Sequence, residues 1–191
     1  MLFRSDVLYH LSTLVDAGRL DPDAVFLDSP MAIRATEIYR QAGPELDEEF
    51  NDRARQGNNP LAADRFRRCR TVDESKQLNE RTAPAVVVAS SGMANGGRIV
   101  HHLARRLPDP ASSVVLVGFQ GAGTRGRALA EGADTVSIHG RRVPVAARVV
   151  QFHGLSAHAD RNELLRWCRA LPAPPERVFS NHGEDPARKA L

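Results

Sequence analysis

Four short loops combine small, polar and ionisable residues directly after apolar, strand-like runs. Each loop leads into a segment with helical spacing, so its backbone N–H groups would lie at a helix N-terminus. Free N–H groups there, together with the helix dipole, favour anions such as phosphate. Taken singly, these loops are also ordinary turn chemistry, since Gly and Ser are common where a strand turns into a helix. The loops are Asp28-Ser29, Ser90-Ser91-Gly92, Gly121-Ala122-Gly123-Thr124 and Asn181-His182-Gly183.

Two histidines, His158 and His182, each lie in a tight loop beside small residues and a carboxylate. An imidazole can bind a metal ion or transfer a proton near neutral pH, and Asp160 or Glu184 would orient the ring. For either histidine alone, a surface position without any role is the alternative interpretation. Together they indicate a metal-binding or proton-transfer site.

The other candidate ligands form no known metal signature. His101 and His102 are adjacent on an expected helix and point to different faces, so we expect no functional role for them. The sequence contains no HExxH, no HxHxDH and no cysteine cluster. We therefore do not expect this chain by itself to assemble a three-ligand zinc site of known spacing.

The segment Gly121–Gly126 matches GxGxxG after an apolar run, the pattern of dinucleotide-binding loops. Such loops are normally followed about 20 residues later by an acidic residue that binds the ribose. Here the next expected strand ends in His139-Gly140-Arg141-Arg142, which suits at most a 2′-phosphate. A nucleotide-binding oxidoreductase is therefore kept as an alternative hypothesis.

The composition is that of a folded globular protein with unevenly distributed charge. Hydrophobic residues make up 42% of the 191 residues and charged residues 26%, far from the signature of disorder. Residues 1–60 carry 6 basic and 11 acidic side chains, whereas residues 61–191 carry 20 and 12. Arginine supplies 24 of the 26 basic side chains, and its planar guanidinium suits phosphate oxygens. Phosphate-rich partners fit this distribution, although coding bias and solvated surface charge would also produce it.

Two features favour a cytoplasmic protein without a membrane partner. No apolar run approaches the ~20 residues needed to span a bilayer, and no basic-then-apolar leader opens the sequence. Cys69 and Cys168 form no CxxC pattern, which suggests free thiols in a reducing compartment.

Short apolar strands alternate with amphipathic helices along the chain. This alternation predicts an α/β fold with a mainly parallel sheet flanked by helices. An antiparallel excursion is expected between residues 136–138 and 145–152, around the turn at 140–142. The expected strands are 24–27, 65–70, 86–89, 114–117 and 177–179, and the expected helices are about 4–17, 31 onward, 44–55, 72–81, 99–107, 124 onward and 161–171.

Five motifs, in one order along nearly the whole chain, resemble those of the metallo-β-lactamase/β-CASP nucleases, and most of all the bacterial ribonucleases of that family. Several motifs in one order are far more specific than any single loop. The motifs are Leu27–Ala32, Ala89–Met93 with Gly96-Gly97-Arg98, Gly118-Phe119-Gln120 with Gly123-Thr124, Ser156–Asp160 and Asn181–Glu184.

The resemblance implies two parts: residues 1–143 as the β-CASP cap and residues 144–191 as a C-terminal, partial αββα segment of the metallo-β-lactamase domain. It also implies a zinc-dependent RNA hydrolase, an endo- or exoribonuclease that cleaves phosphodiester bonds. His158 would act near the scissile phosphate as a general acid or phosphate stabiliser, with Asp160 as the second catalytic candidate. His182 would bind one of two zinc ions.

The resemblance further implies that the backbone of single-stranded RNA runs along the polar loops at the strand ends. A non-catalytic RNA-binding module that uses the basic face is the alternative. The implied RNA- or phosphate-binding residues are Ser29, Ser90, Ser91, Gly92, Gly123, Thr124 and Ser156.

One departure from the family pattern concerns the metal site. The HxHxDH signature and the family's other zinc ligands have no counterpart in this sequence. Because a two-metal site needs most of those ligands, we expect a truncated member of the family with an incomplete zinc site and no activity alone. Its partner would be a second copy of the chain or the missing metallo-β-lactamase half.

Overall fold

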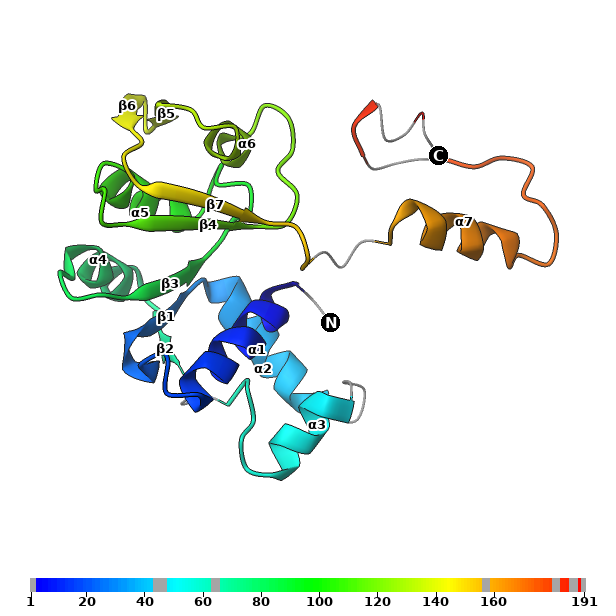
Figure 1. Ribbon diagram of the computed structural model, residues 1–191, viewed down its shortest axis with the longest axis horizontal. Helices are drawn as coiled ribbons and strands as arrows, with labels where there is room; N and C mark the ends of the chain where they lie inside the picture. Colours follow the sequence, from blue (N-terminus) through cyan, green and yellow to red (C-terminus); the bar gives the residue numbers. More distant parts are fainter. Residues whose placement is uncertain are drawn as a thin grey trace. The chain divides into compact units, whose positions relative to one another are not determined.

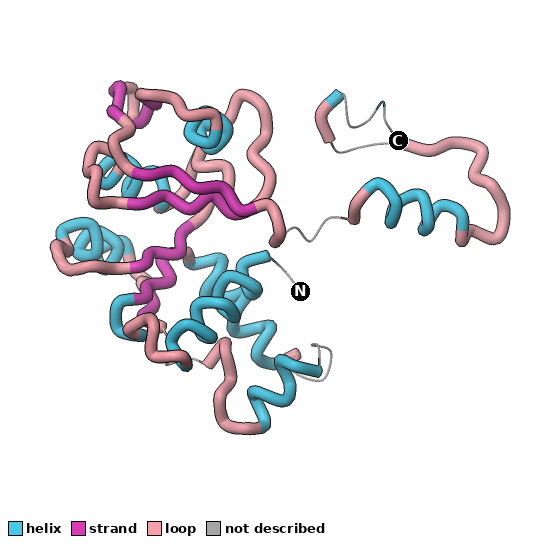
Figure 2. Tube along the Cα trace, viewed as in Figure 1, coloured by secondary structure: helices cyan, strands magenta, loops and turns pink. Residues whose placement is uncertain are grey.

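The computed structural model describes residues 3–42, 48–62, 66–155, 159–179, 183–185 and 189 (Figure 1). The chain divides into two compact units, Met1–Leu155 and Ser156–Leu191. Among the described helices, none is long and apolar enough to cross a membrane. The expected α/β class is confirmed in the first unit, where helices flank parallel strands (Figure 2).

The first half of this unit is built on the strand β1 (Val25–Asp28), which lies between β2 (Arg67–Arg68) and β3 (Val86–Ala89). Both strand pairs are parallel. All four β1 residues are buried, as expected for a central parallel strand covered on both faces. The helices of this half are α1 (Phe3–Asp16), α2 (Pro30–Gln41), α3 (Glu48–Arg55) and α4 (Val72–Glu80), with a short 3-10 turn η1 (Pro22–Ala24).

Alternate residues of β1 enter two different apolar cores, because successive side chains of a strand point to opposite faces. Val25 and Leu27 pack in a core with Leu8 of α1. Phe26 packs on the other face with Leu78 of α4. The strand is therefore held by helices on both sides, and its carboxyl end is fixed in place.

The second half of the unit has its own apolar core, formed mainly by α5 and α6 under a parallel pair of strands. Val100 and Leu103 of α5 lie in this core with Leu116 of β4 and Leu129 of α6. Strand β4 pairs in parallel with β7, and β5 pairs antiparallel with β6. The elements are α5 (Ile99–Arg106), β4 (Ser113–Val117), α6 (Arg125–Ala130), β5 (Thr135–Ile138), β6 (Arg141–Pro144) and β7 (Arg148–Phe152).

The antiparallel pairing expected between residues 136–138 and 145–152 is wrong: residues 135–138 pair antiparallel with 141–144 instead, and 148–152 pair in parallel with β4. His139 and Gly140 both have positive φ angles, 49° and 74°, and make a two-residue turn, so the return strand begins at once as β6. That strand ends at Pro144, which has no N–H to donate to a ladder. The N–H groups of Ala146 and Ala147 then donate to Leu107 O. This contact leads the chain into β7, beside β4.

The second unit contains the helix α7 (Arg161–Arg169), within the expected range 161–171. The strand expected at 177–179 is wrong: these residues are described and form no strand. Strands need a hydrogen-bonded neighbour, and in the described part of this unit no second strand offers one. Complete capping boxes stabilise the starts of two helices: Thr71 with Glu74 at the start of α4, and Asp160 with Glu163 at the start of α7.

Gly97 permits the tightest backbone approach in the loop between β3 and α5. Its φ is +76°, and a Cβ atom there would lie 2.4 Å from Ser90 O. The carbonyl of Ser90 is held in place because it accepts from Ile99 N. A side chain at position 97 would thus be strained by its φ angle and would collide with fixed backbone.

Replacing Gly97 by alanine should lower the free energy of unfolding by about 2–4 kcal/mol, the sum of a left-handed backbone penalty and overpacking. Urea denaturation measures this value. Gly96→Ala is the matched control, because a Cβ at Gly96 meets nothing within 4 Å. Equal stability of the two variants would contradict the close approach.

Candidate functional site

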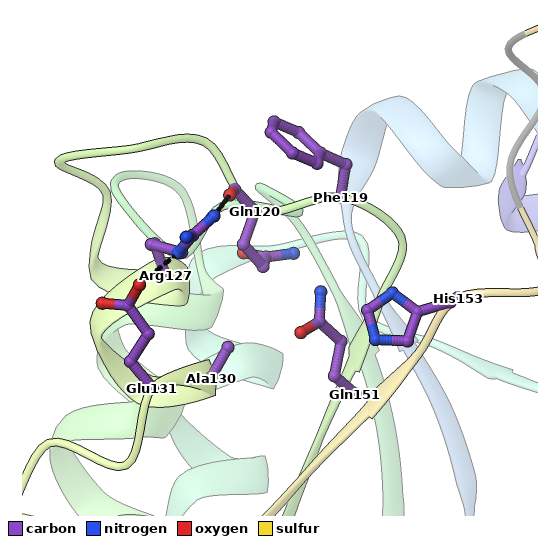
Figure 3. A pocket seen from close by; sticks show the side chains of 7 residues that line it. All are labelled: Phe119, Gln120, Arg127, Ala130, Glu131, Gln151 and His153. Carbon is purple, nitrogen blue, oxygen red and sulfur yellow. Dashed lines mark hydrogen bonds and ion pairs between the residues drawn. The ribbon is translucent and has the colours of Figure 1, made fainter. Parts of the chain in front are cut away.

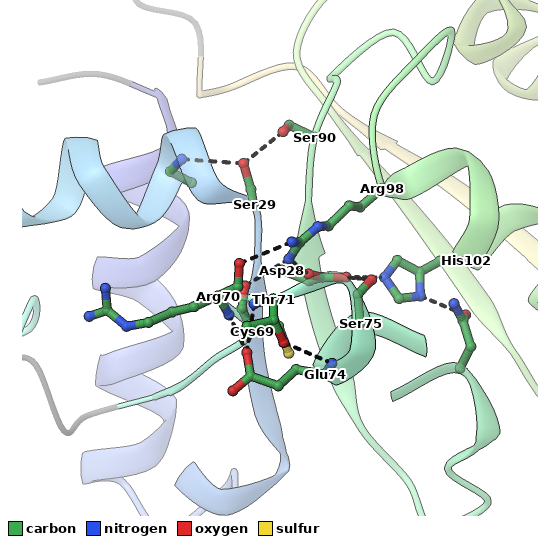
Figure 4. A network of polar contacts seen from close by, with 12 residues as sticks. Asp28, Ser29, Cys69, Arg70, Thr71, Glu74, Ser75, Ser90, Arg98 and His102 are labelled. Carbon is green, nitrogen blue, oxygen red and sulfur yellow. Dashed lines mark hydrogen bonds and ion pairs between the residues drawn. The ribbon is translucent and has the colours of Figure 1, made fainter. Parts of the chain in front are cut away.

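The loops after β1 and β3 meet through two serine hydroxyls. The parallel register places Asp28 opposite Ala89, so the next residues, Ser29 and Ser90, leave the sheet side by side. Their Oγ atoms lie 2.7 Å apart in a hydrogen bond (Figure 4). Ser29 Oγ also accepts from Ala32 N at 3.2 Å and caps the N-terminus of α2. Two hydroxyls and a helix N-terminus are thereby brought together at the carboxyl edge of the sheet.

The loop of residues 90–97 connects this serine pair to the start of α6. Gln120 Nε2 donates to Gly92 O at 3.1 Å. Gly126 N donates to Met93 O at 3.0 Å, and Arg125 N donates to Asn95 Oδ1 at 2.8 Å. Three loops that follow three different strands therefore form one rim, which we call the strand-end rim: residues 29, 90–97 and 120–126.

Gly123 and Thr124, two of the predicted binding residues, form the turn that enters α6 on this rim. Gly123 has a φ of +76°, which favours glycine. Thr124 Oγ1 donates to Gly121 O at 2.6 Å and accepts from Arg127 N at 3.2 Å, so it caps the helix. Thr124 thus has a clear structural role, and its contact with a ligand stays a prediction.

Beneath the rim lies a carboxylate with no solvent exposure, Asp28. Its Oδ1 accepts from an Arg98 guanidinium nitrogen at 2.5 Å. Its Oδ2 accepts from Ser75 Oγ and bonds to His102 Nε2, both at 2.6 Å (Figure 4). One carboxylate therefore joins β1, α4, the end of the 90–97 loop and α5.

Burial is the largest single influence on the Asp28 carboxyl and by itself would raise its pKa. Hydrogen bonds from His102, Ser75 and Arg98 together outweigh burial, and the pKa lies below the ordinary value of 3.8. Asp28 is therefore a carboxylate at neutral pH. The neighbouring Cys69 behaves in the opposite way, since burial, reinforced by the Asp28 charge, raises the pKa of its thiol to about 11. Cys69 is protonated at neutral pH and unsuited to nucleophilic or metal chemistry.

Arg98 extends the network toward β2 and the residues that follow it. The same guanidinium donates to Cys69 O at 2.7 Å and to Arg70 O at 3.1 Å. Because Arg98 directly follows the 90–97 loop, its bonds fix the end of that loop over the sheet. The rim is thus pinned at Ser90 on one side and at Arg98 on the other.

The structural importance of Arg98 and His102 was missed in the sequence. His102, for which we expected no functional role, is buried and also bonds through Nδ1 to Asn79 Oδ1 at 2.8 Å. The available signal is spacing: Arg98 and His102 are four residues apart and so share one helix face. The buried Val100 and Leu103 lie on the other side of the helix, in the apolar core.

Several predicted site residues lie outside the described part of the chain: Ser156, His158 and His182. Asp160 is described, and its carboxylate caps α7 by accepting from Glu163 N at 2.8 Å. Among the described residues, no group of three or more His, Cys, Asp or Glu side chains is arranged to hold a metal ion. These residues therefore do not fit a zinc ion by themselves, and the role of His182 as a ligand stays a prediction.

Two family models match the chain. The Beta-Casp domain matches residues 5–129. The Zn-dependent metallo-hydrolase RNA specificity domain matches residues 142–191. The first match alone covers more than half of the chain, and it contains the whole strand-end rim.

Three similar proteins carry names from RNA metabolism and transcription. The chain is 38% identical to ribonuclease TTHA0252 of Thermus thermophilus, over 97% of this chain and 42% of that protein. It is 30% identical to an RNase J-like protein of Methanocaldococcus jannaschii, over 94% of this chain and 40% of the relative. It is 31% identical to transcription termination factor FttA of the same organism, over 84% of this chain and 26% of that protein. The chain spans less than half the length of these relatives.

Acid should weaken the folded state through Asp28. Because its folded pKa is lower than its unfolded value, its stabilising contribution is complete above about pH 4 and is lost as the pH falls through the folded pKa. At neutral pH, the free energy of unfolding of Asp28→Asn should be about 3–5 kcal/mol lower than that of the wild type, since Arg98 loses its buried counter-charge. The variant should also show a shallower loss of stability below pH 4, measured by urea denaturation from pH 2.5 to 7.

The control for this comparison is Asp73→Asn, which removes an exposed carboxylate from α4. It should keep the native pH profile and change stability by less than about 0.5 kcal/mol. If Asp28→Asn kept the full acid sensitivity, the inferred coupling between Asp28 ionisation and folding would be wrong.

Proposed function

The chain belongs to the metallo-β-lactamase/β-CASP family, and we propose that it is the RNA-binding cap and C-terminal segment of an RNA hydrolase. The observation that carries this proposal is the strand-end rim. The hydroxyl groups of Ser29 and Ser90, the N-terminus of α2 and the loop before α6 lie together there, at the carboxyl ends of β1, β3 and β4. Helix N-termini and hydroxyls are typical ligands of phosphate oxygens.

The rim suits the backbone of single-stranded RNA better than a single small anion. It spans three strand ends, and its loops are locked to one another before any ligand arrives. Ser91 and Gly92 lie between the serine pair and the α6 turn, so a chain of phosphates could run from one to the other. The excess of arginine after residue 60 supplies long-range attraction to such a polyanion.

We assign residues 1–143 to the cap and residues 144–191 to the metallo-β-lactamase domain. The separate family matches to residues 5–129 and 142–191 support a boundary in this region. The compact first unit continues to Leu155, because β7 pairs along its whole length with β4. In this assignment β7 is the strand that leads from the cap to the catalytic segment.

For hydrolysis we assign His182 as a zinc ligand, and His158 as the group that stabilises the scissile phosphate or protonates the leaving oxygen. Asp160 is the second catalytic candidate, and Ser156 a further backbone contact. Zinc would activate the attacking water. The remaining ligands would come from the rest of a longer protein or from a second chain, because this sequence has no HxHxDH signature. The 191-residue chain is then an RNA-binding protein that does not cleave alone.

Binding to a 12-nucleotide single-stranded RNA should weaken steeply as salt rises, because each phosphate contact releases counterions. A negative charge on the rim should oppose the RNA: Ser91→Asp should weaken binding about tenfold, as expected for one close charge contact at a partly exposed position. Fluorescence anisotropy between 50 and 300 mM salt measures both effects. Ser137→Asp on β5 is the matched control, and its affinity should stay near that of the wild type. A flat salt response would refute backbone binding.

With added zinc, the chain alone should leave an end-labelled single-stranded RNA uncut, because most of the metal ligands are missing. Denaturing gel electrophoresis over several hours measures this. His158→Ala and His182→Ala should behave like the wild type. Cleavage by the wild type that both variants abolish would contradict the incomplete-site proposal and would mean that a working centre assembles from this chain.

A further inference from the structure

A hollow of about 320 Å³ opens next to the strand-end rim, at the carboxyl ends of β4 and β7 (Figure 3). This volume is at the lower end of the range for sites that bind small organic groups. The hollow combines one aromatic ring, two amides, an imidazole and one ion pair. Its lining is formed by Phe119, Gln120, Arg127, Ala130, Glu131, Gln151 and His153.

The aromatic ring of the hollow is largely exposed. Phe119 directly follows the Gly118 turn after β4, and 58% of it is accessible to solvent. It stands at the edge of the hollow above the amides (Figure 3). An exposed phenyl ring offers a flat apolar face, and every nucleobase has a π-face that can stack on it regardless of sequence.

The polar groups below the ring are held in fixed positions. Gln120 is only 1% exposed and donates to Gly92 O. This hydrogen bond joins the lining of the hollow to the 90–97 loop. Gln151 donates through Nε2 to Gly118 O at 3.0 Å. Gln151 is only partly buried, so its anchored amide can present a hydrogen-bonding group to the edge of a ring without first losing side-chain freedom.

The charge in the hollow is balanced locally. Arg127 Nε lies 2.5 Å from Glu131 Oε1, so the arginine and the glutamate among the described lining residues are paired with each other. An ion pair of this kind gives the hollow little attraction for a phosphate. It suits an uncharged, planar group with polar edges.

We propose that this hollow binds one base of single-stranded RNA, stacked on Phe119, while the neighbouring phosphates lie on the strand-end rim. The proposal rests on the proposed function, since it requires RNA on the rim. An aromatic platform beside a path for the backbone is the usual construction of single-strand sites. Stacking there holds a base without reading its identity, so the platform adds affinity with little sequence preference.

The test uses the 191-residue chain and a 12-nucleotide RNA with 2-aminopurine at successive positions, whose fluorescence is quenched when it stacks. A matched oligonucleotide has the same number of phosphates but abasic sugars. Phe119→Ala should weaken binding of the base-bearing RNA about five- to a hundredfold and remove the quenching at one position. It should leave the affinity for the abasic backbone and the salt dependence unchanged. Phe119→Tyr should retain quenching, whereas Phe119→Leu should lose it.

Phe152→Ala is the control, because Phe152 is similarly exposed at 53% but follows Gln151 on β7 and so points to the other face of the strand. It should behave like the wild type. If Phe119→Ala bound base-bearing RNA as tightly as the wild type, with the same salt dependence, the stacking site would be refuted. The proposal that the rim binds the RNA backbone would not be affected. If neither oligonucleotide bound the wild type, both the proposed function and the stacking site would fall.

Discussion

A buried carboxylate organises the part of the molecule that carries its candidate chemistry. Removing Asp28 from water is unfavourable unless its oxygens are fully bonded, and the fold meets this requirement with Ser75, Arg98 and His102. These partners come from segments that follow different strands. The need to satisfy one charge therefore fixes α4, α5 and the 90–97 loop relative to the end of β1.

The surface above this charge follows from the same constraint. Arg98 holds the end of the 90–97 loop, and the Ser29–Ser90 bond holds its beginning. Gly97 lets the loop fold back onto Ser90 because it has no side chain. The loop in turn supports the α6 turn through Gly92, Met93 and Asn95. The rim is consequently rigid before a ligand binds, which reduces the entropy lost on binding.

The rim and the adjacent hollow offer complementary chemistry. The rim has serine hydroxyls and the N-terminus of α2, which are suited to phosphate oxygens. The hollow has an exposed ring, anchored amides and a neutralised arginine, suited to an uncharged heterocycle. Both lie at the carboxyl ends of parallel strands, where open α/β sheets commonly place their ligands. A single nucleotide contains both kinds of group, which is why the proposed RNA ligand would engage both.

The sequence by itself determined the features that depend on neighbours three or four residues apart. Caps at Ser29, Thr71 and Asp160 set the helix starts, because a side chain there bonds to the next turn of its own helix. Apolar runs such as 86–89 located the strands, and the order of motifs indicated the family. The sequence also allowed the prediction that Ser29 and Ser90 lie near each other, since both follow strands of a parallel sheet.

Only the tertiary structure decided which distant groups meet. Nothing in the periodicity of 145–152 indicates that 148–152 pairs with β4 rather than with 136–138; the tight His139-Gly140 turn and Pro144 decide it. The choice of His102, 74 residues from Asp28, as a partner for that carboxylate likewise leaves no local pattern. The hollow beside Phe119 depends on residues of the loop after β4, of α6 and of β7. Such contacts are set by the packing of whole elements and by the demand that every buried charge be satisfied, and neither is encoded in a short stretch of sequence.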